Sequence, residues 1–299
     1  MNSALFYSIL QKSFQFEPTL KQTLFFQKVA DFVTNQENNT IFILKGYAGT
    51  GKTTVISNLV TNLVSIPKKY VLLAPTGRAA KVIANYSGKP AFTIHKKIYF
   101  PKKNASGGMQ FVRQINKHKN TLFIVDESSM ISDAVFDSKN GETVSVLDDL
   151  IQYVYSGQNC KILFLGDTAQ LPPVNLDVSP ALEAHTLTNE FNKEVLQMEL
   201  DEVMRQEANS GILKNATALR LLLEDEFIYE FKFHVKPFKD IVRLVDGYDI
   251  QDAIQSSYDS KGIEETAFIV RTNKRANQYN QQIRNRILFR ESELATGDY

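Results

Sequence analysis

Several features that would place a protein in a membrane or outside the cell are scarce or missing in this chain. Its 299 residues contain one cysteine, Cys160, so no disulfide can form within the chain, and no apolar run approaches the length of a membrane span. Residues 1–7 lack the basic region that opens a secretory signal peptide. We therefore expect a cytoplasmic protein with no membrane partner. Cys160 precedes the apolar run 161–165, which predicts a buried structural thiol.

Acidic residues are absent from one long stretch of the chain. The net charge is only +1, yet residues 38–125 hold 14 of the 34 lysines and arginines and none of the 33 aspartates and glutamates. This distribution predicts a local positive surface, suited to nucleic acid, on an otherwise acidic body. A nucleotide site alone would account for Lys45 and Lys52. It would not account for Lys96, Lys97, Lys102, Lys103, Arg113, Lys117 and Lys119.

The strongest motif is Gly-Tyr-Ala-Gly-Thr-Gly-Lys-Thr-Thr at residues 46–54, which fits the phosphate-loop pattern G-x-x-x-x-G-K-[ST]. A strand pattern precedes it at 40–44 and a helical pattern follows from residue 55. Glycines let backbone N–H groups wrap closely around phosphate oxygens, and a helix N-terminus adds partial positive charge. We expect Lys52 to reach the β- and γ-phosphates of ATP and the Thr53 hydroxyl to ligate Mg²⁺. The other expected nucleotide contacts in the loop are Gly46, Ala48, Gly49, Thr50, Gly51 and Thr54.

The order of strand and helix patterns predicts the fold. Apolar strand patterns at 70–74, 121–125 and 161–165 alternate with helical ones, which is typical of a parallel sheet covered by helices on both faces. We expect an α/β protein of the P-loop NTPase class with an ATP-binding domain over residues 1–180. Strand patterns at 241–245 and 267–271, with helical patterns around them, indicate a second αβ unit over residues 181–299 that has no phosphate loop of its own.

Two of the predicted strands end in side chains suited to phosphate chemistry. Asp126 and Glu127 follow the strand at 121–125, where a carboxylate beside a phosphate loop can hold Mg²⁺ through water. Glu127 is placed to orient or deprotonate an attacking water. Gln170 lies on the turn after the strand at 161–165, for which a purely structural turn is the alternative. Ligands gather at the carboxyl ends of parallel strands, so we expect these residues to share one edge of the sheet.

Residues 97–118 interrupt the αβ alternation. Two runs rich in aromatic and basic residues, 97–103 and 109–113, flank a glycine-containing turn and predict a β-hairpin. Aromatic rings among positive charges suit single-stranded nucleic acid, since bases stack on the rings and phosphates pair with the charges. A hairpin whose aromatic residues merely pack on the main domain fits the sequence equally well.

Together these motifs resemble superfamily 1 DNA helicases, in particular the RecD-like and Dda-like branch that moves 5′ to 3′. The resemblance runs from Gln22 to about Tyr299. It rests on the phosphate loop, on residues 74–80, 93–96, 125–130 and 166–174, and on Val-Met-Arg-Gln at 203–206. It implies RecA-like motor domains, the second of them partial here, that move on single-stranded DNA or at a junction with duplex. It also implies a monomer with replication or recombination proteins as further partners.

The resemblance assigns roles to further residues. Gln22 would contact adenine, Gln170 would sense the γ-phosphate, and Arg205 would reach that phosphate from the second domain. The hairpin would split the duplex, with Phe100 or Phe111 as its wedge. The residues that would touch DNA elsewhere are Thr76, Gly77, Arg78, Thr93, His95, Thr272 and Asn273. For His95, a buried structural histidine is the alternative.

One departure from the family pattern concerns the end of the chain. The family continues through an SH3-like insertion and two more motifs, including a late arginine that completes the ATP site, whereas this sequence stops at residues 296–299. We therefore expect a truncated helicase that hydrolyses ATP poorly, since such an arginine contributes about a thousandfold or more. The alternatives are a nucleotide- and DNA-binding module without efficient hydrolysis or unwinding, and a phosphate-loop kinase or metabolic ATPase.

Overall fold

The structure, a computed structural model, describes residues 2–103, 109–133, 136–137, 143–202, 210–224 and 230–290. The chain divides into two compact units, Met1–Gln206 and Glu207–Tyr299, each of which is described by itself. No helix in the described ranges is long and apolar enough to cross a membrane.

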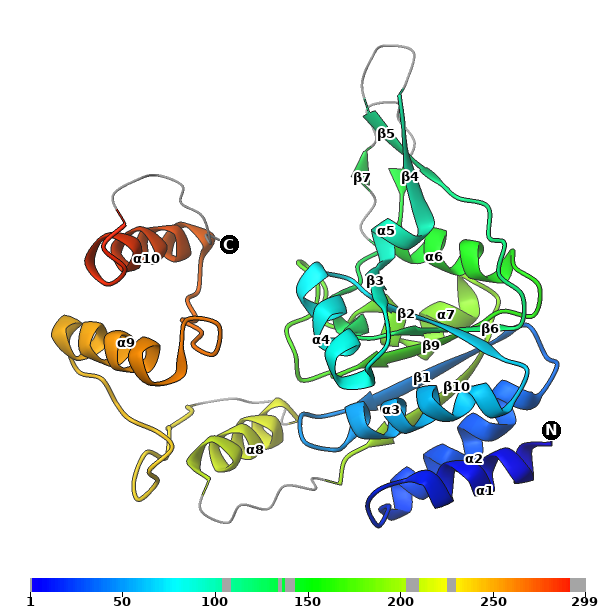
Figure 1. The fold of residues 1–299 in the computed structure, drawn as a ribbon, viewed down its shortest axis with the longest axis horizontal. Helices are drawn as coiled ribbons and strands as arrows, with labels where there is room; N and C mark the ends of the chain where they lie inside the picture. The colour runs from blue at the N-terminus through cyan, green and yellow to red at the C-terminus, as the bar shows by residue number, and fades with distance from the viewer. Residues whose placement is uncertain are drawn as a thin grey trace. The chain divides into compact units, whose positions relative to one another are not determined.

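A six-stranded sheet in the order β10-β1-β9-β6-β2-β3 forms the frame of the first unit (Figure 1). Each pair of neighbouring strands is parallel, which confirms the predicted α/β fold. The middle strands are buried almost throughout, as their unbroken apolar sequences predict. The strands are β1 (Thr40–Gly46), β2 (Lys69–Ala74), β3 (Ala91–Thr93), β6 (Thr121–Val125), β9 (Lys161–Gly166) and β10 (Glu194–Leu200).

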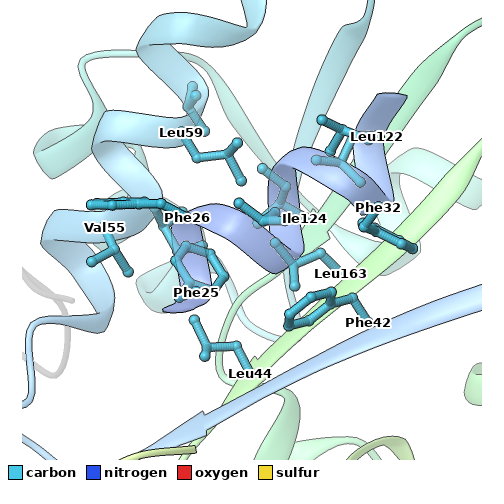
Figure 2. Packing of buried hydrophobic residues seen from close by; sticks show 14 of the residues in the cluster. Phe25, Phe26, Phe32, Phe42, Leu44, Val55, Leu59, Leu122, Ile124 and Leu163 are labelled. Carbon is cyan, nitrogen blue, oxygen red and sulfur yellow. The ribbon is translucent and has the colours of Figure 1, made fainter. Parts of the chain in front are cut away.

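Helices cover both faces of this sheet and bury two apolar clusters. Figure 2 shows the first cluster, in which Phe25, Phe26 and Phe32 of α2 pack with side chains of α3 on the sheet. The helices of this face are α1 (Ser3–Ser13), α2 (Leu20–Thr34), α3 (Lys52–Asn62) and α4 (Gly77–Ser87). The second face carries α5 (Ile94–Ile98), α6 (Val146–Tyr155) and α7 (Ala184–Asn189). Short 3₁₀ turns lie at Leu63–Ser65, Ser128–Met130 and Pro180–Leu182.

Local capping residues fix where the helices begin. The Thr19 side chain accepts from the N–H of Gln22, while the Gln22 side chain accepts from the N–H of Thr19. This capping box starts α2 at Leu20. α1, capped by Asn2, is an additional helix that packs Phe6 against the first cluster.

The predicted hairpin is present as β4 (Tyr99–Lys103) and β5 (Met109–Arg113) (Figure 1). Its base is attached to α6 through Asp149, which accepts from the Tyr99 hydroxyl at 2.7 Å and from Arg113 at 3.0 Å. Arg113 therefore serves to anchor the hairpin. A second, shorter antiparallel pair is formed by β7 (Phe136–Asp137) and β8 (Thr143–Val144). Cys160 is 1% exposed, which confirms the buried thiol, and burial raises its pKa.

The division between the units lies later than the boundary predicted near residue 180. β10 (Glu194–Leu200) pairs with β1 along its whole length, so residues 181–200 belong to the first unit. A pairing between segments this far apart in sequence leaves no local signal, which explains the difference.

The described residues of the second unit form α8 (Gly211–Glu224), α9 (Gly247–Lys261) and α10 (Asn273–Arg286). The strands predicted at 241–245 and 267–271 are not formed in this described part. Their apolar side chains are largely exposed, as at Val242 (76%) and Ile269 (91%). A strand exists through hydrogen bonds to a neighbour, so an apolar sequence without one stays irregular. That this unit is a partial RecA-like domain thus remains a prediction.

Lys161, the first residue of β9, is fully buried beneath the end of α2. Its ammonium donates to the carbonyl oxygens of Phe32 at 2.7 Å and Asn35 at 3.1 Å, and thereby satisfies two acceptors where the helix ends. We expect Lys161→Met to lower the free energy of unfolding by about 1–3 kcal/mol, because these carbonyls lose their buried donor. Urea denaturation measures the change. Lys69→Met is the control, since Lys69 opens β2 but is exposed; equal losses in both variants would contradict the assigned role.

Candidate active site

The phosphate loop joins the end of β1 to the start of α3. Gly49 and Gly51 both have φ of +83°, a left-handed conformation that glycine adopts without strain. A Cβ on Gly51 would lie 2.6 Å from Nε2 of Gln22, and a Cβ on Gly46 would lie 2.8 Å from the Leu200 carbonyl oxygen. The loop thus requires glycine at these positions, as the motif predicts.

Lys52 is the first residue of α3, and its ammonium folds back over the loop. It donates to the carbonyl oxygens of Gly46 and of Tyr47, the latter at 2.9 Å. The helix has no side-chain cap, because Gly51 occupies the N-cap position. The backbone N–H groups of its first turn and the adjacent ammonium are therefore arranged as in an anion site. Thr53 lies exposed on the same turn.

Gln22 connects α2 to the phosphate loop. It is only 2% exposed, and its Nε2 donates to the Thr50 carbonyl oxygen at 3.2 Å. Its Oε1 already accepts from the backbone of Thr19, so the amide positions the loop before any ligand binds. The bond to Thr50 uses one of the two Nε2 hydrogens of Gln22. The side chain also lines the cleft beside the loop, where the second hydrogen is placed for the predicted contact with adenine.

Asp126 and Glu127 follow β6, two strands from β1 in the sheet. Asp126 Oδ1 accepts from the N–H of Glu127 at 3.0 Å, and Oδ2 accepts from the Tyr86 hydroxyl at 2.7 Å. Glu127 has φ of +53°, an uncommon conformation that costs about 1–3 kcal/mol and is concentrated at functional sites. Burial, and secondarily the charge of Asp126, raise the pKa of Glu127; a hydrogen bond from Gln170 and the charge of Lys52 partly oppose this shift.

Gln170 lies on the turn after β9, as predicted. Its amide bonds the Glu127 carboxylate, and its Oε1 accepts from the Ser129 hydroxyl at 3.1 Å. The Gln170 side chain thus faces the acidic end of β6, and its role as a sensor of the γ-phosphate stays a prediction. Asp167, 6% exposed, shapes this turn by accepting from the N–H of Ala169 at 2.9 Å. It was not singled out beforehand, although an acidic residue at a third strand end was visible in the sequence.

These groups line one cleft of about 600 Å³. Thr53 and Asp126 offer hydroxyl and carboxylate oxygens, which are hard ligands that suit Mg²⁺. Within the described ranges, no group of three or more histidine, cysteine or acidic side chains forms an all-protein metal site. Mg²⁺ characteristically combines one or two protein ligands with substrate phosphates, so this donor set fits it. The cleft is also lined by residues that sequence reasoning missed, namely Phe14, Phe16, Val82 and Tyr86.

The residues predicted to line a single-strand path lie at the ends of β2 and β3, where Ala74 pairs with Thr93. Thr76 and Thr93 each cap a helix, accepting from the N–H groups of Ala79 and Lys96 at 3.2 Å. The structural alternative for His95 is wrong, because its ring is exposed. The other exposed residues here that could meet a phosphate backbone are Gly77, Arg78, Lys81, Lys96, Lys102 and Lys103.

The hairpin presents its two phenylalanines on opposite faces. Phe100 pairs with Val112 and Phe111 pairs with Pro101, so the two rings point in opposite directions from the ribbon. Phe100 is 41% and Phe111 68% exposed, whereas Tyr99 is 8% exposed. Tyr99 is therefore packed on the main domain, whereas the two candidate wedges, Phe100 and Phe111, are exposed.

Thr272 and Asn273, two of the remaining predicted site residues, belong to the second unit. Thr272 caps α10 by accepting from the N–H of Arg275 at 3.2 Å, and Asn273 is the first residue of that helix; both are exposed. Arg205 lies outside the described residues, so its role stays a prediction.

Comparison with known proteins shows what this chain is similar to. Residues 30–176 match the family described as AAA domain (AAA_19). The ATP-dependent RecD2 DNA helicase of Deinococcus radiodurans is 28% identical over 195 residues, which cover 64% of this chain and 23% of that protein. The ATP-dependent DNA helicase dda of Enterobacteria phage T4 is 29% identical over 180 residues, 59% of this chain and 37% of that protein. In these comparisons the chain resembles RecD-like and Dda-like helicases of superfamily 1.

This chain spans less than half the length of these two curated relatives. Among solved structures, the Pif1 helicase from Bacteroides, in complex with ADP-AlF3 and ssDNA, aligns over 93% of this chain and 58% of that one. The TM-score is 0.47 and the sequence identity 18%.

Proposed function

We propose that this chain carries the ATP-hydrolysing motor unit of a DNA helicase that moves on single-stranded DNA. The strongest support for this proposal is that three groups of functional residues meet at one edge of the sheet. The adjacent strands β1, β9 and β6 deliver the phosphate loop, Gln170 and the Asp126–Glu127 pair to a single cleft. The substrate, Mg²⁺ and DNA are all part of this proposal, because the helicase relatives are much longer than this chain.

ATP binding would begin with the phosphates at the start of α3. The N–H groups of residues 49–53 and the partial positive charge of the helix would hold the phosphate oxygens. Lys52 would exchange the neutral carbonyls of Gly46 and Tyr47 for anionic phosphate oxygens, to which its positive charge is attracted more strongly. Gln22, already fixed against the loop, would present its amide to the base.

Thr53 and Asp126 would hold Mg²⁺, which supplies neutralisation of charge on the β- and γ-phosphates. Glu127 would accept a proton from the attacking water as the water oxygen bonds to the γ-phosphorus. The bond from that phosphorus to the bridging oxygen breaks, and ADP leaves with its electron pair. A raised pKa makes Glu127 a stronger base, and Gln170 would keep its carboxylate oriented toward the γ-phosphate.

Single-stranded DNA would run along the ends of β2 and β3. The exposed Arg78, Lys96 and Lys102 are suited to its phosphates, and the exposed rings of Phe100 and Phe111 to its bases. Because the base of the hairpin is fixed to α6 through Asp149, the rings are presented on a supported ribbon that is suited to separating a duplex.

DNA binding tests this proposal through the hairpin. We expect Phe111→Ala to weaken binding of a fluorescent oligo-dT strand by about 1–3 kcal/mol, roughly 5- to 150-fold, through loss of one stacking platform. Fluorescence anisotropy at fixed salt measures the affinity. Phe233→Ala is the matched control, because Phe233 of the second unit is 67% exposed against 68% for Phe111. If the intact chain binds no single-stranded DNA, a phosphate-loop kinase or metabolic ATPase becomes the better assignment.

The raised pKa of Glu127 predicts the pH dependence of hydrolysis. The ionised carboxylate is the active base, so kcat is full above this pKa and falls as the pH drops through it, above the value of about 4.3 for an ordinary glutamate. Gln170→Ala removes a hydrogen bond that lowers the pKa, so the acidic limb of kcat should move to higher pH. A pH–rate profile of each protein measures the position of its acidic limb. An acidic limb in the same position in both proteins would contradict this coupling.

A further inference from the structure

Tyr86, near the end of α4, bonds a carboxylate in the nucleotide cleft. Its hydroxyl donates to Oδ2 of Asp126 at 2.7 Å, and its side chain forms part of the cleft wall. None of the motifs includes Tyr86, and the catalytic scheme above gives it no role. The question is whether this hydroxyl acts in the site or only fills space.

The bond completes the orientation of Asp126. The main chain there is held by the N–H of Asp126, which donates to the Leu73 carbonyl oxygen at 2.9 Å. Oδ1 accepts from the N–H of Glu127 at 3.0 Å, and Tyr86 engages the other oxygen. The terminal torsion of an aspartate is intrinsically broad, so a partner on each oxygen fixes the carboxylate plane. Each oxygen keeps a further lone pair for a metal ion or its water.

Tyr86 is itself held by the helix that begins with Lys52 and Thr53. Its carbonyl oxygen accepts from the Ser57 hydroxyl of α3 at 3.4 Å, and its ring packs against the first apolar cluster. Through its backbone and its hydroxyl, Tyr86 therefore links the helix that carries Thr53 to the strand end that carries Asp126. These are the two residues expected to hold Mg²⁺.

The chemical nature of the donor is informative. Phenylalanine would fill the same apolar space, so packing alone does not require the hydroxyl. A lysine or arginine could also bond the carboxylate, but its positive charge would oppose a divalent cation. A neutral phenol fixes Asp126 and leaves its full negative charge available.

We propose that Tyr86 is a positioning residue for the Mg²⁺ site, orienting Asp126 through its hydroxyl toward the metal that accompanies the nucleotide. This rests on the proposed binding of Mg²⁺–ATP. Outer partners of metal ligands are typically worth about 10- to 100-fold in metal affinity. The hydroxyl should thus matter for the Mg²⁺-dependent part of nucleotide binding and not for the remainder.

Isothermal titration calorimetry with ATPγS separates these parts. For each protein, the ratio of the Kd in EDTA to the Kd in Mg²⁺ gives the enhancement by the metal. We expect Tyr86→Phe to reduce this ratio about tenfold, with an unchanged Kd in EDTA that also reports an intact site. Tyr155→Phe is the control, because it removes a hydroxyl that also donates at 2.7 Å, to the Thr40 carbonyl oxygen outside the cleft. In an Asp126→Asn background, Tyr86→Phe should cause no further reduction.

Three results would overturn the proposal: an enhancement equal to that of the unaltered chain, a larger one, or an equal tenfold loss in the Asp126→Asn background. A larger enhancement would show that the hydroxyl competes with the metal. Failure of the unaltered chain to bind ATPγS in Mg²⁺ is a different result, since it removes the proposed function itself. Binding by the unaltered chain with no effect of Tyr86→Phe removes only the role of Tyr86.

Discussion

Lys52→Ala is expected to lower ATP affinity about 10- to 100-fold and to reduce hydrolysis to background. A hydrogen bond to a charged group contributes about 1.5–3 kcal/mol, and each 1.4 kcal/mol is tenfold in affinity. We expect both losses to arise in the cleft itself, because the Lys52 ammonium bonds the carbonyls of Gly46 and Tyr47 and forms part of the cleft. Titration calorimetry and a phosphate-release assay measure the two losses.

Lys28→Ala is the control for this variant. Lys28 is an exposed lysine of α2 and does not line the nucleotide cleft, so both ATP affinity and turnover should be retained. An Lys52→Ala protein that melts normally and still hydrolyses ATP at the rate of the unaltered chain would mean that the phosphate loop is not the site of the reaction.

Glu127→Gln should have the second large effect, on turnover alone. A positioned general base contributes about 10²- to 10⁴-fold, so single-turnover hydrolysis should slow by that factor. Glutamine keeps the size of the side chain and can still bond Gln170. It also removes a half-buried carboxylate next to Asp126, so ATP should bind at least as tightly as before. Rapid-quench measurements with radiolabelled ATP separate binding from hydrolysis.

Glu190→Gln makes the same chemical change at an exposed glutamate that follows α7, and it should leave hydrolysis unchanged. A Glu127→Gln protein that binds ATP and hydrolyses it at an undiminished rate would place the base elsewhere. One that cannot bind ATP would show that Glu127 acts in binding rather than in proton transfer.

Sequence patterns predicted the parts of this protein that depend on local chemistry. The phosphate loop needs glycine where φ is positive, as at Gly51, and that requirement is visible in the chain itself. Strands buried on both faces read as unbroken apolar runs, so β6 was found at its observed bounds. Because parallel strands share a carboxyl edge, the predicted parallel sheet also placed Asp126 at the same edge as the loop.

Long-range contacts were not predictable in this way. The pairing of β10 with β1 moved the unit boundary, and it depends on segments about 150 residues apart in sequence. Tyr86 reaches Asp126 from a helix whose sequence carries no sign of that bond. Lys161 is a charged residue at the start of an apolar strand, and nothing in the local pattern shows that its stem and ammonium are buried beneath α2. In each case tertiary packing determines the partner, and the local periodicity of the sequence does not predict it.

The hairpin combines a feature that the sequence predicted with contacts that it did not predict. Its existence followed from two aromatic runs around a glycine-containing turn, but the anchoring of Tyr99 and Arg113 on Asp149 did not. Nor could the pattern show that Phe100 and Phe111 face opposite sides, which depends on the register of the two strands.

The central claim, that this chain carries a DNA-dependent ATP motor, is tested most directly by steady-state ATPase activity with and without single-stranded DNA, beside Lys52→Ala. We predict Mg²⁺-dependent turnover that rises when DNA is added and is absent from the variant. Tight DNA binding without stimulated turnover would instead indicate a nucleotide- and DNA-binding module. Absence of both DNA binding and ATP hydrolysis in the folded chain would contradict the account.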